Sequence, residues 1–262
     1  MNATEEIKRH LMEVEREHDV RVLLAVESGS RARGFESANS DWDVRFIYVH
    51  KLQWYLSVEK KRDVIDYMYE DGVDLVGWDL KKALSLLRQS NPSLFEWLHS
   101  PIVYHADGDF MHRIHEVEDC CFNPAKLMFH YNHIYLKHDI RYLQKKKGSL
   151  KVFFYYLRGI LACKWIEQHH TLPPVAFEEL MEATVEEDEL REKIYHLIAI
   201  KKSGAGKDTT AIDTDLKEYA YHWAEYYHGR IETSQPEENE VPTKELDRLL
   251  YDMVMRRERG LL

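Results

Sequence analysis

Residues 27–46, with the sequence ESGSRARGFESANSDWDVRF, connect two apolar runs of the chain. The runs, Val20–Val26 and Val44–Val49, are short and continuous, which is typical of buried strands. A turn of small residues follows the first run, and Asp41 and Asp43 come directly before the second. The rest of the chain is interpreted outward from this order of strand, turn, aspartate pair and strand.

The two aspartates are two residues apart at the start of a predicted strand. Because strand side chains alternate between the two faces of a sheet, both carboxylates should point to the same face. Neighbouring carboxylates repel each other unless a cation lies between them, and Mg²⁺ binds through one or two carboxylates plus substrate phosphates. Backbone N–H groups of Gly29 and the hydroxyl of Ser30 are suitable donors to such phosphates. We therefore expect a site for Mg²⁺ or Mn²⁺ and phosphate; a polar turn that enters a strand is the alternative.

These residues resemble a known signature. The pattern Gly29-Ser30-Arg31-Ala32-x-Gly34 followed by Ser40-Asp41-x-Asp43 is similar to that of the DNA polymerase β-like nucleotidyltransferase superfamily, in the version of its small bacterial members. Later segments narrow the resemblance to the nucleotidyltransferases associated with bacterial RNA-repair operons. These segments are residues 77–84, 90–92, 96–98, 100–104, 151–158, 163–166 and 173–174. The resemblance covers most of residues 20–200.

The order of predicted elements indicates an α+β fold with two domains. Strands or extended pieces are predicted at 20–26, 42–50, 64–69, 73–78 and 100–104. Helices are predicted at 4–18, 30–34, 80–87, 93–98, 112–121, 124–147, 150–169, 177–181, 186–202, 216–230 and 244–256. We expect a polymerase β-like nucleotidyltransferase domain at 1–106, with a mixed sheet and helices on one face, and an all-helical domain at 107–262.

A third carboxylate is implied by the resemblance, on a strand beside the aspartate pair, where it helps to deprotonate the attacking hydroxyl. Asp74, inside the predicted strand at 73–78, is our choice. Asp79 is the alternative, but it stands directly before a predicted helix, and a capping role explains it. Asp66 is a more distant candidate. The expected catalytic and metal-binding residues are Asp41, Asp43 and Asp74.

Several cations are candidates for binding a triphosphate. Arg31 or Arg33, next to Ser30, can neutralise its charge, although a solvated turn explains both arginines as well. Lys151 and Arg158 lie on one face of an apolar helix, where a cation is costly without a partner. That partner is either a triphosphate in a cleft between the domains, as the resemblance implies, or an acidic side chain. The expected nucleotide-binding residues are Gly29, Ser30, Arg31, Arg33, Lys151 and Arg158.

The charge of the chain limits its interaction with nucleic acid. The formal net charge is −10, which argues against a protein that coats nucleic acid in general. Between Pro124 and His170, however, nine Lys and Arg residues stand against only Asp139 and Glu167. A local basic surface for RNA phosphates is compatible with this segment, and solvated helix faces are the alternative.

The cysteine and histidine positions give no metal signature. The cysteines at 120, 121 and 163 have no metal-type spacing and indicate reduced thiols in a cytoplasm. No apolar run approaches the roughly 20 residues of a membrane span, so no membrane partner is expected. Histidines stand at 112/115, 130/133/138 and 169/170. His130 and His133 are one helical step apart but have no Cys or Glu at a closing distance, and we interpret all these histidines as scattered polar side chains.

Taken together, the sequence predicts an enzyme. The expected reaction transfers a nucleoside monophosphate from a nucleoside triphosphate, with ATP as the expected donor, to an acceptor hydroxyl, and releases pyrophosphate. The resemblance suggests an RNA 3′ end as the acceptor, and a protein hydroxyl, as in AMP-transferring relatives, is equally allowed. A non-catalytic nucleotide- or RNA-binding accessory protein is the main alternative.

Overall fold

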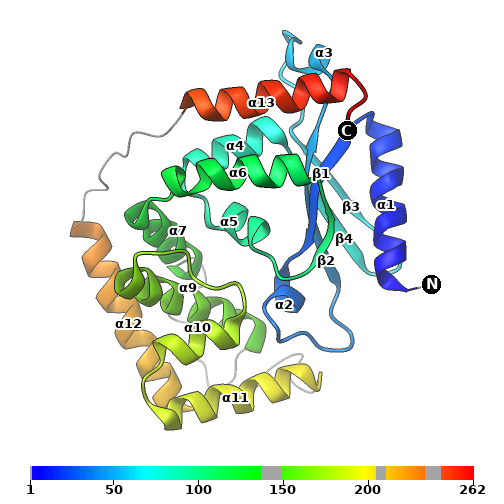
Figure 1. Cartoon of the computed structure of the whole chain (residues 1–262). Coiled ribbons are helices and arrows are strands. Elements are labelled where there is room, and N and C mark those ends of the chain that lie inside the picture. The colour runs from blue at the N-terminus through cyan, green and yellow to red at the C-terminus, as the bar shows by residue number, and fades with distance from the viewer. Residues whose placement is uncertain (1, 137–148, 205–210, 234–242) are drawn as a thin grey trace. The chain divides into compact units, whose positions relative to one another are not determined.

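A five-stranded mixed sheet holds the segments on both sides of the predicted site (Figure 1). Its strands are β1 (Arg21–Glu27), β2 (Trp42–Val49), β3 (Val64–Met68), β4 (Val73–Asp79) and β5 (Val103–Ala106), in the order β3-β4-β2-β1-β5. The β2–β4 pair is parallel, and the other neighbouring pairs are antiparallel. The structure, a computed structural model, describes residues 2–136, 149–204, 211–233 and 243–262. The mixed sheet agrees with the predicted fold class.

Helix α1 (Ala3–His18) covers one face of the sheet. Its apolar residues Ile7, Leu11 and Val14 recur at helical spacing and are buried in a cluster with alternate residues of the strands. In β2 these alternate residues are Val44, Phe46 and Tyr48. The residues between them, Asp43, Arg45 and Ile47, therefore point to the opposite face.

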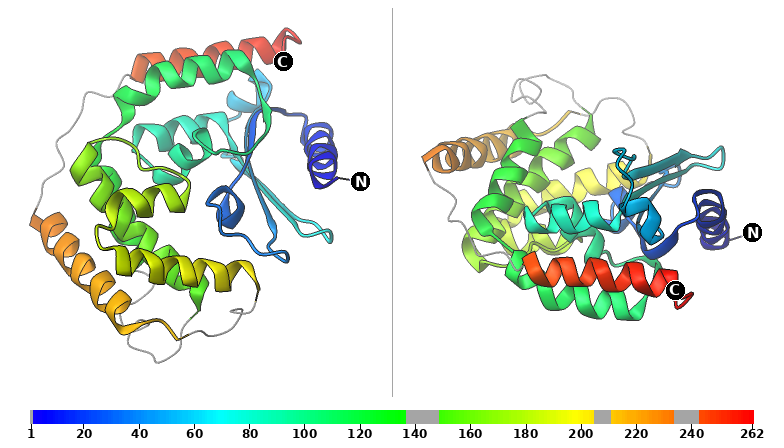
Figure 2. Two further views of the ribbon diagram at one scale, coloured as in Figure 1. Left: turned by 60° about the horizontal axis from the view of Figure 1, so that its bottom comes forward. Right: turned by 90° about the horizontal axis from the view of Figure 1, so that it is seen from above.

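Other helices lie on that opposite face, as the views in Figures 1 and 2 show. They are α4 (Leu80–Arg88), α5 (Pro92–Leu98), α6 (Gly108–Cys121) and α13 (Thr243–Glu258). The sequence analysis expected helices on one face only. Both faces are covered because six of the seven residues of β1 are buried, and a strand buried on both sides needs packing partners on both sides.

The chain divides into two units by its internal contacts. The sheet unit comprises Met1–Ala32, Asp41–Phe122 and Asn239–Leu262, and the helical unit comprises Arg33–Ser40 and Asn123–Glu238. The last strand ends at Ala106, where the predicted first domain ends. The units follow packing rather than secondary structure, so α6 and α13 belong with the sheet. The division into domains at 1–106 and 107–262 stays a prediction.

The helical unit is built around α9 (Leu150–His169). Most of α9 is buried, because the helix is apolar on nearly all sides. The helices α7 (Pro124–Leu136), α10 (Phe177–Thr184) and α12 (Thr214–Thr233) contact it, and α11 (Asp188–Lys202) packs on α12. Phe35, which lies in the Arg33–Ser40 segment of the helical unit, stacks on Phe154 of α9 with ring centroids 5.1 Å apart. The predicted helix at 124–147 is observed up to Leu136, and its remainder lies outside the described residues.

Two further observations bear on the cell-biological predictions. Cys120 is an exposed free thiol, and Cys121 and Cys163 are buried free thiols. Across the described ranges, none of the helices combines the length and the apolar character that a bilayer crossing demands.

Candidate active site

Asp43 and Asp74 lie side by side on the two parallel strands of the sheet. In the ladder between β2 and β4, Asp43 pairs directly with Asp74, and both side chains point away from α1. Nη2 of Arg45 donates to Oδ1 of Asp43 at 3.2 Å and to Oδ2 of Asp74 at 2.9 Å. Two of the three predicted carboxylates are thus neighbours, with a guanidinium cation bound to both.

The small-residue turn lies against the same aspartate. A Cβ atom on Gly29 would fall 1.9 Å from Oδ2 of Asp43, and the φ of Gly29 is +60°. Both facts require glycine at this position. The backbone N–H of Ser28 donates to the carbonyl of Asp43 at 2.8 Å. The start of α2 (Gly29–Ala32), which carries Ser30, is therefore fixed beside the Asp43 carboxylate.

Glu27 binds the backbone of Asp43 through a hydrogen bond. The sequence analysis did not identify this residue. Its Oε1 accepts the backbone N–H of Asp43 at 2.9 Å, and its Oε2 accepts the hydroxyl of Tyr104 at 2.5 Å. The residue is fully buried, and burial raises the pKa of its carboxyl to about 7, although both hydrogen bonds act to lower it. A glutamate at a strand end is usually solvated, so its burial follows from tertiary packing alone.

Asp41 is the third predicted carboxylate. It is exposed, and its Oδ1 lies 3.9 Å from where a Cβ of Gly72 would be. Within the part of the chain that the structure describes, Asp41, Asp43 and Asp74 do not form a group with all ligand atoms within 4.8 Å. Carboxylates repel one another, and three of them approach closely only around a cation.

The two arginines of the turn fall in different units. Arg31 belongs to the sheet unit, where its guanidinium lies 3.8 Å from the ring centroid of Trp42 and its Nε donates to the carbonyl of Asp41 at 3.4 Å. Arg33 belongs to the helical unit, where its guanidinium lies 4.9 Å from the ring centroid of Tyr155. Arg31 is thus the arginine in the same unit as the carboxylates.

The two cations of α9 differ in their surroundings. Arg158 is 3% exposed, and its guanidinium donates to the carbonyls of Val175 and Pro174, each at 3.1 Å. These carbonyls are hydrogen-bond partners for the buried cation, in addition to the acidic side chain or triphosphate that the sequence analysis considered. Lys151 is exposed in the first turn of the helix.

The other two candidates for the third carboxylate have structural partners. Asp79 is 1% exposed and caps α4: its Oδ1 accepts the N–H of Lys81 at 2.9 Å, and its Oδ2 accepts the hydroxyl of Tyr55 at 2.7 Å. Asp66 is exposed on β3 and forms an ion pair with Arg62. Of the three candidates, Asp74 is the one that pairs with Asp43 in the sheet.

The donor set fits a hard divalent cation. The Asp43 and Asp74 carboxylates share one face, are about one quarter to one third exposed, and already bind a cation in the form of Arg45. Oxygen ligands of this kind are those that Mg²⁺ and Mn²⁺ prefer. Arg45 could have been found from the sequence, since it stands two residues after Asp43 and strand alternation puts both on one face.

A second type of cluster was missed by the sequence analysis. Among the described residues, two groups of at least three His, Asp or Glu side chains have all ligand atoms within 4.8 Å of one another, and they are His99/His115/Glu118 and Glu6/His10/Asp71. The first includes a histidine that we had interpreted as a scattered polar side chain. Its signal was the spacing of His115 and Glu118, one helical step apart.

Comparison with known proteins gives three findings. The sequence model of the RNA repair pathway DNA polymerase beta family matches residues 3–252. The uncharacterized protein YcgL of Bacillus subtilis (strain 168) is 39% identical over 250 residues, which cover 95% of this chain and 94% of that protein. The crystal structure of a nucleotidyltransferase-like protein from Exiguobacterium sibiricum aligns over 99% of this chain and 92% of its own, with 14% identity and a TM-score of 0.32. This last similarity is too low to carry an argument.

Proposed function

Because the chain belongs to the RNA repair pathway DNA polymerase beta family, we propose that it is an active nucleotidyltransferase. It transfers a nucleoside monophosphate from a nucleoside triphosphate, ATP first, to an acceptor hydroxyl, and pyrophosphate leaves. The observation that supports this reaction best is the in-register pair of Asp43 and Asp74 beside Gly29. Paired carboxylates can hold the metal ions of phosphoryl transfer, and backbone N–H groups of the adjacent turn can bind phosphate oxygens.

Each residue has a role in this proposal. Asp43 and Asp74, together with Asp41, hold one or two Mg²⁺ or Mn²⁺ ions, which when bound neutralise the phosphates and align in-line attack on the α-phosphorus. Asp74 takes up the proton of the acceptor hydroxyl as the new bond to phosphorus forms. Ser30 and the N–H of Gly29 bind the β- and γ-phosphates.

The remaining candidates supply charge. Arg31 lies in the sheet unit, close enough to Asp41 to donate to its carbonyl, and neutralises the triphosphate. Lys151 adds a second, exposed cation. Arg33 and Arg158 are weaker candidates, because Arg33 packs on Tyr155 and Arg158 is engaged with two carbonyls of the chain.

An RNA 3′ end is the proposed acceptor, and its support comes from the family. The basic segment from Pro124 to His170 adds little, since its Arg158 and Lys164 are both 3% exposed. The cations between Lys137 and Lys147 lie outside the described residues. RNA with a free 3′ hydroxyl is therefore compared in the test with RNA whose 3′ end is blocked and with protein acceptors.

The test follows labelled nucleotide into acceptors in the presence of Mg²⁺ or Mn²⁺. Asp43→Asn and Asp74→Asn should each lower transfer about 100-fold or more, because each removes charge from the reacting centre. Asp66→Asn is the matched control, since Asp66 lies on the neighbouring strand β3 and forms an ion pair with Arg62. Transfer that survives both Asp43→Asn and Asp74→Asn at the wild-type rate excludes the proposed reaction.

One observation favours a second candidate, a nucleotide- or RNA-binding protein without turnover. Arg45 already donates to both carboxylates and balances one of their two negative charges, and it makes two further hydrogen bonds to the carbonyls of Val44 and Asp74 at 3.0 Å and 2.9 Å. A cation fixed in this way competes with a metal ion for Asp43 and Asp74. Calorimetric binding of ATP, with no pyrophosphate released in the presence of any acceptor, would support this candidate.

A further inference from the structure

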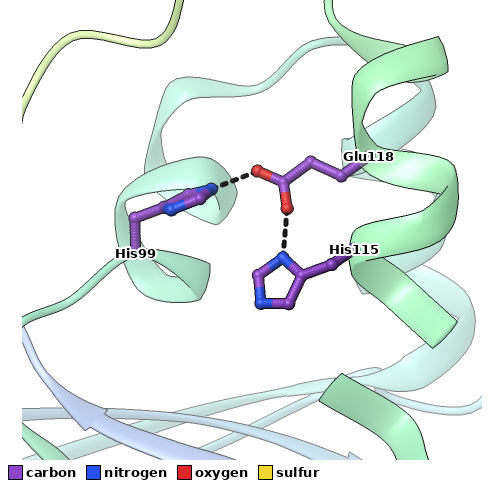
Figure 3. A group of neighbouring side chains, drawn as sticks. All are labelled: His99, His115 and Glu118. Carbon is purple, nitrogen blue, oxygen red and sulfur yellow. Dashed lines mark hydrogen bonds and ion pairs between the residues drawn. The ribbon is translucent and has the colours of Figure 1, made fainter. Parts of the chain in front are cut away.

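Two histidines and a buried glutamate of the sheet unit lie close to one another (Figure 3). His99 caps the C-terminus of α5, and His115 and Glu118 lie on one face of α6. Nδ1 of His115 is 2.6 Å from Oε2 of Glu118, and Nε2 of His99 contacts Oε1 of the same carboxylate. Each carboxylate oxygen thus faces a different imidazole.

The carboxylate is buried and the imidazoles are open to solvent. The Glu118 side chain is 5% exposed, whereas those of His99 and His115 are 46% and 42% exposed. A buried carboxylate is costly unless cations or donors compensate it. The two imidazole nitrogens that face Glu118 provide this compensation, and the solvent-exposed edges of the rings form the mouth of the site.

From this geometry we propose that His99, His115 and Glu118 form a binding site for a transition-metal ion of the Zn²⁺ type. Two imidazole nitrogens and one carboxylate oxygen are a common three-ligand set for Zn²⁺ and neighbouring metals, with water at the open position. The exposed imidazole edges give the ion a route from solvent. This site is separate from the proposed Mg²⁺ site and does not depend on the proposed nucleotide transfer.

Little movement is needed to admit the ion. Ligand atoms at about 2.0–2.1 Å from a tetrahedral Zn²⁺ lie about 3.3 Å apart. All three ligand atoms already lie within 4.8 Å of one another, so the shortest contacts must open and the longest must close by a rotation of exposed imidazoles. Metal binding replaces protons on the imidazoles, as it does in other histidine sites. The bound ion would tie the end of α5 to the middle of α6.

The experiment measures metal binding to the full chain, purified without a histidine tag and treated with a chelator. Zn²⁺ is titrated in competition with a chromophoric chelator, and Co²⁺ is titrated separately, because its visible absorption reports four-coordinate geometry. We expect one ion per chain at this site and a raised melting temperature. His99→Ala combined with His115→Ala should weaken binding at least about 10-fold and remove the Co²⁺ absorption.

His112→Ala is the matched control, since His112 lies on the same helix but faces Glu116 with 74% of its side chain exposed. This control should bind the ion as the wild type does. The single variants His99→Gln and His115→Gln keep a polar side chain and carry the test if the double variant misfolds. Binding that persists in these variants, binding lost equally in His112→Ala, or no bound ion in the wild type would each refute the site and leave a hydrogen-bonded network only. Retained Zn²⁺ binding in Asp43→Asn separates this result from the nucleotide site.

Discussion

At the scale of single residues, Glu27 links the protonation of a buried group to the position of Asp43. Its folded-state pKa of about 7 lies above the ordinary value of 4.5. Below pH 4.5 the folded and unfolded chains both hold the proton. As the pH rises to 7 the unfolded chain loses it first, so this group lowers the free energy of unfolding by about 3 kcal/mol over that interval.

Glu27→Gln should remove this dependence, because the amide keeps an acceptor for the N–H of Asp43 and does not ionise. Urea unfolding at pH 5 and pH 8 measures the effect. From pH 5 to pH 8, the free energy of unfolding of the variant should rise by about 2–3 kcal/mol relative to that of the wild type. Parallel changes in the two proteins would show that Glu27 does not titrate in this range.

The sequence predicted the aspartate site only in part, for physical reasons. Alternation along a strand predicts Asp41 and Asp43 on one face, but β2 begins at Trp42 and leaves Asp41 outside the strand. The pairing of Asp74 with Asp43 needs the register between β2 and β4, which a strand's own sequence does not contain. The burial of Glu27 needs Tyr104 from a strand far along the chain.

At the scale of elements, the start of α4 distinguishes a structural carboxylate from a chemical one. Asp79→Ala removes the acceptor for the N–H of Lys81 and for the hydroxyl of Tyr55, and should lower the free energy of unfolding by about 1–3 kcal/mol. Asp79→Asn keeps an acceptor for the N–H of Lys81, and its amide N–H can donate to the Tyr55 hydroxyl, so this variant should keep nucleotide transfer. In contrast to both Asp79 variants, Asp74→Asn should lose nucleotide transfer and largely keep its free energy of unfolding.

Denaturant unfolding and the transfer assay, run on the same three proteins, check this prediction. Burial raises the pKa of Asp79 to about 6, which means that the fold disfavours its charged form. Replacement by the neutral amide is therefore a milder change here than at an exposed carboxylate. Loss of transfer in Asp79→Asn with full transfer in Asp74→Asn would assign the third carboxylate to Asp79 instead.

Element prediction was accurate where local signals are strong. The helix predicted at 150–169 is observed with the same bounds, since a long apolar run with a polar start specifies it locally. The strand β5 is observed at Val103–Ala106 instead of 100–104, because its extent is set by pairing with β1 rather than by its own residues. The observed helix ends differ from the predicted ends by a few residues, because the terminal turns of helices fray and are only weakly specified by local sequence.

At the scale of the whole molecule, the helix α13 is part of the sheet unit although it is the last element of the chain. It contacts α4, α6 and β2, and Arg256 donates to Asp107 and Asp109 at 3.0 Å each. An amphipathic pattern shows that a helix has an apolar face but does not name the surface that covers it. The sequence therefore predicted this helix and not its place.

Met253→Ala tests how much α13 stabilises the sheet unit. Met253 is fully buried, so its truncation should lower the free energy of unfolding by about 2–5 kcal/mol. Tyr251→Ala, on the same helix with 61% exposure, is the control and should change it by less than about 0.5 kcal/mol. Urea unfolding followed by circular dichroism measures both, and equal effects would show that α13 is not packed as described.

The assignment of α13 to the sheet unit also determines the order in which the parts of that unit are synthesised. The chain for β1 to β5 and α6 emerges first, then the whole of Asn123–Glu238, and only then the helix that covers α4 and α6. Until that moment the nascent sheet unit exposes the apolar surface that α13 later buries, and chaperones can bind it there. The sheet unit is thus completed only after the chain of the helical unit has been synthesised.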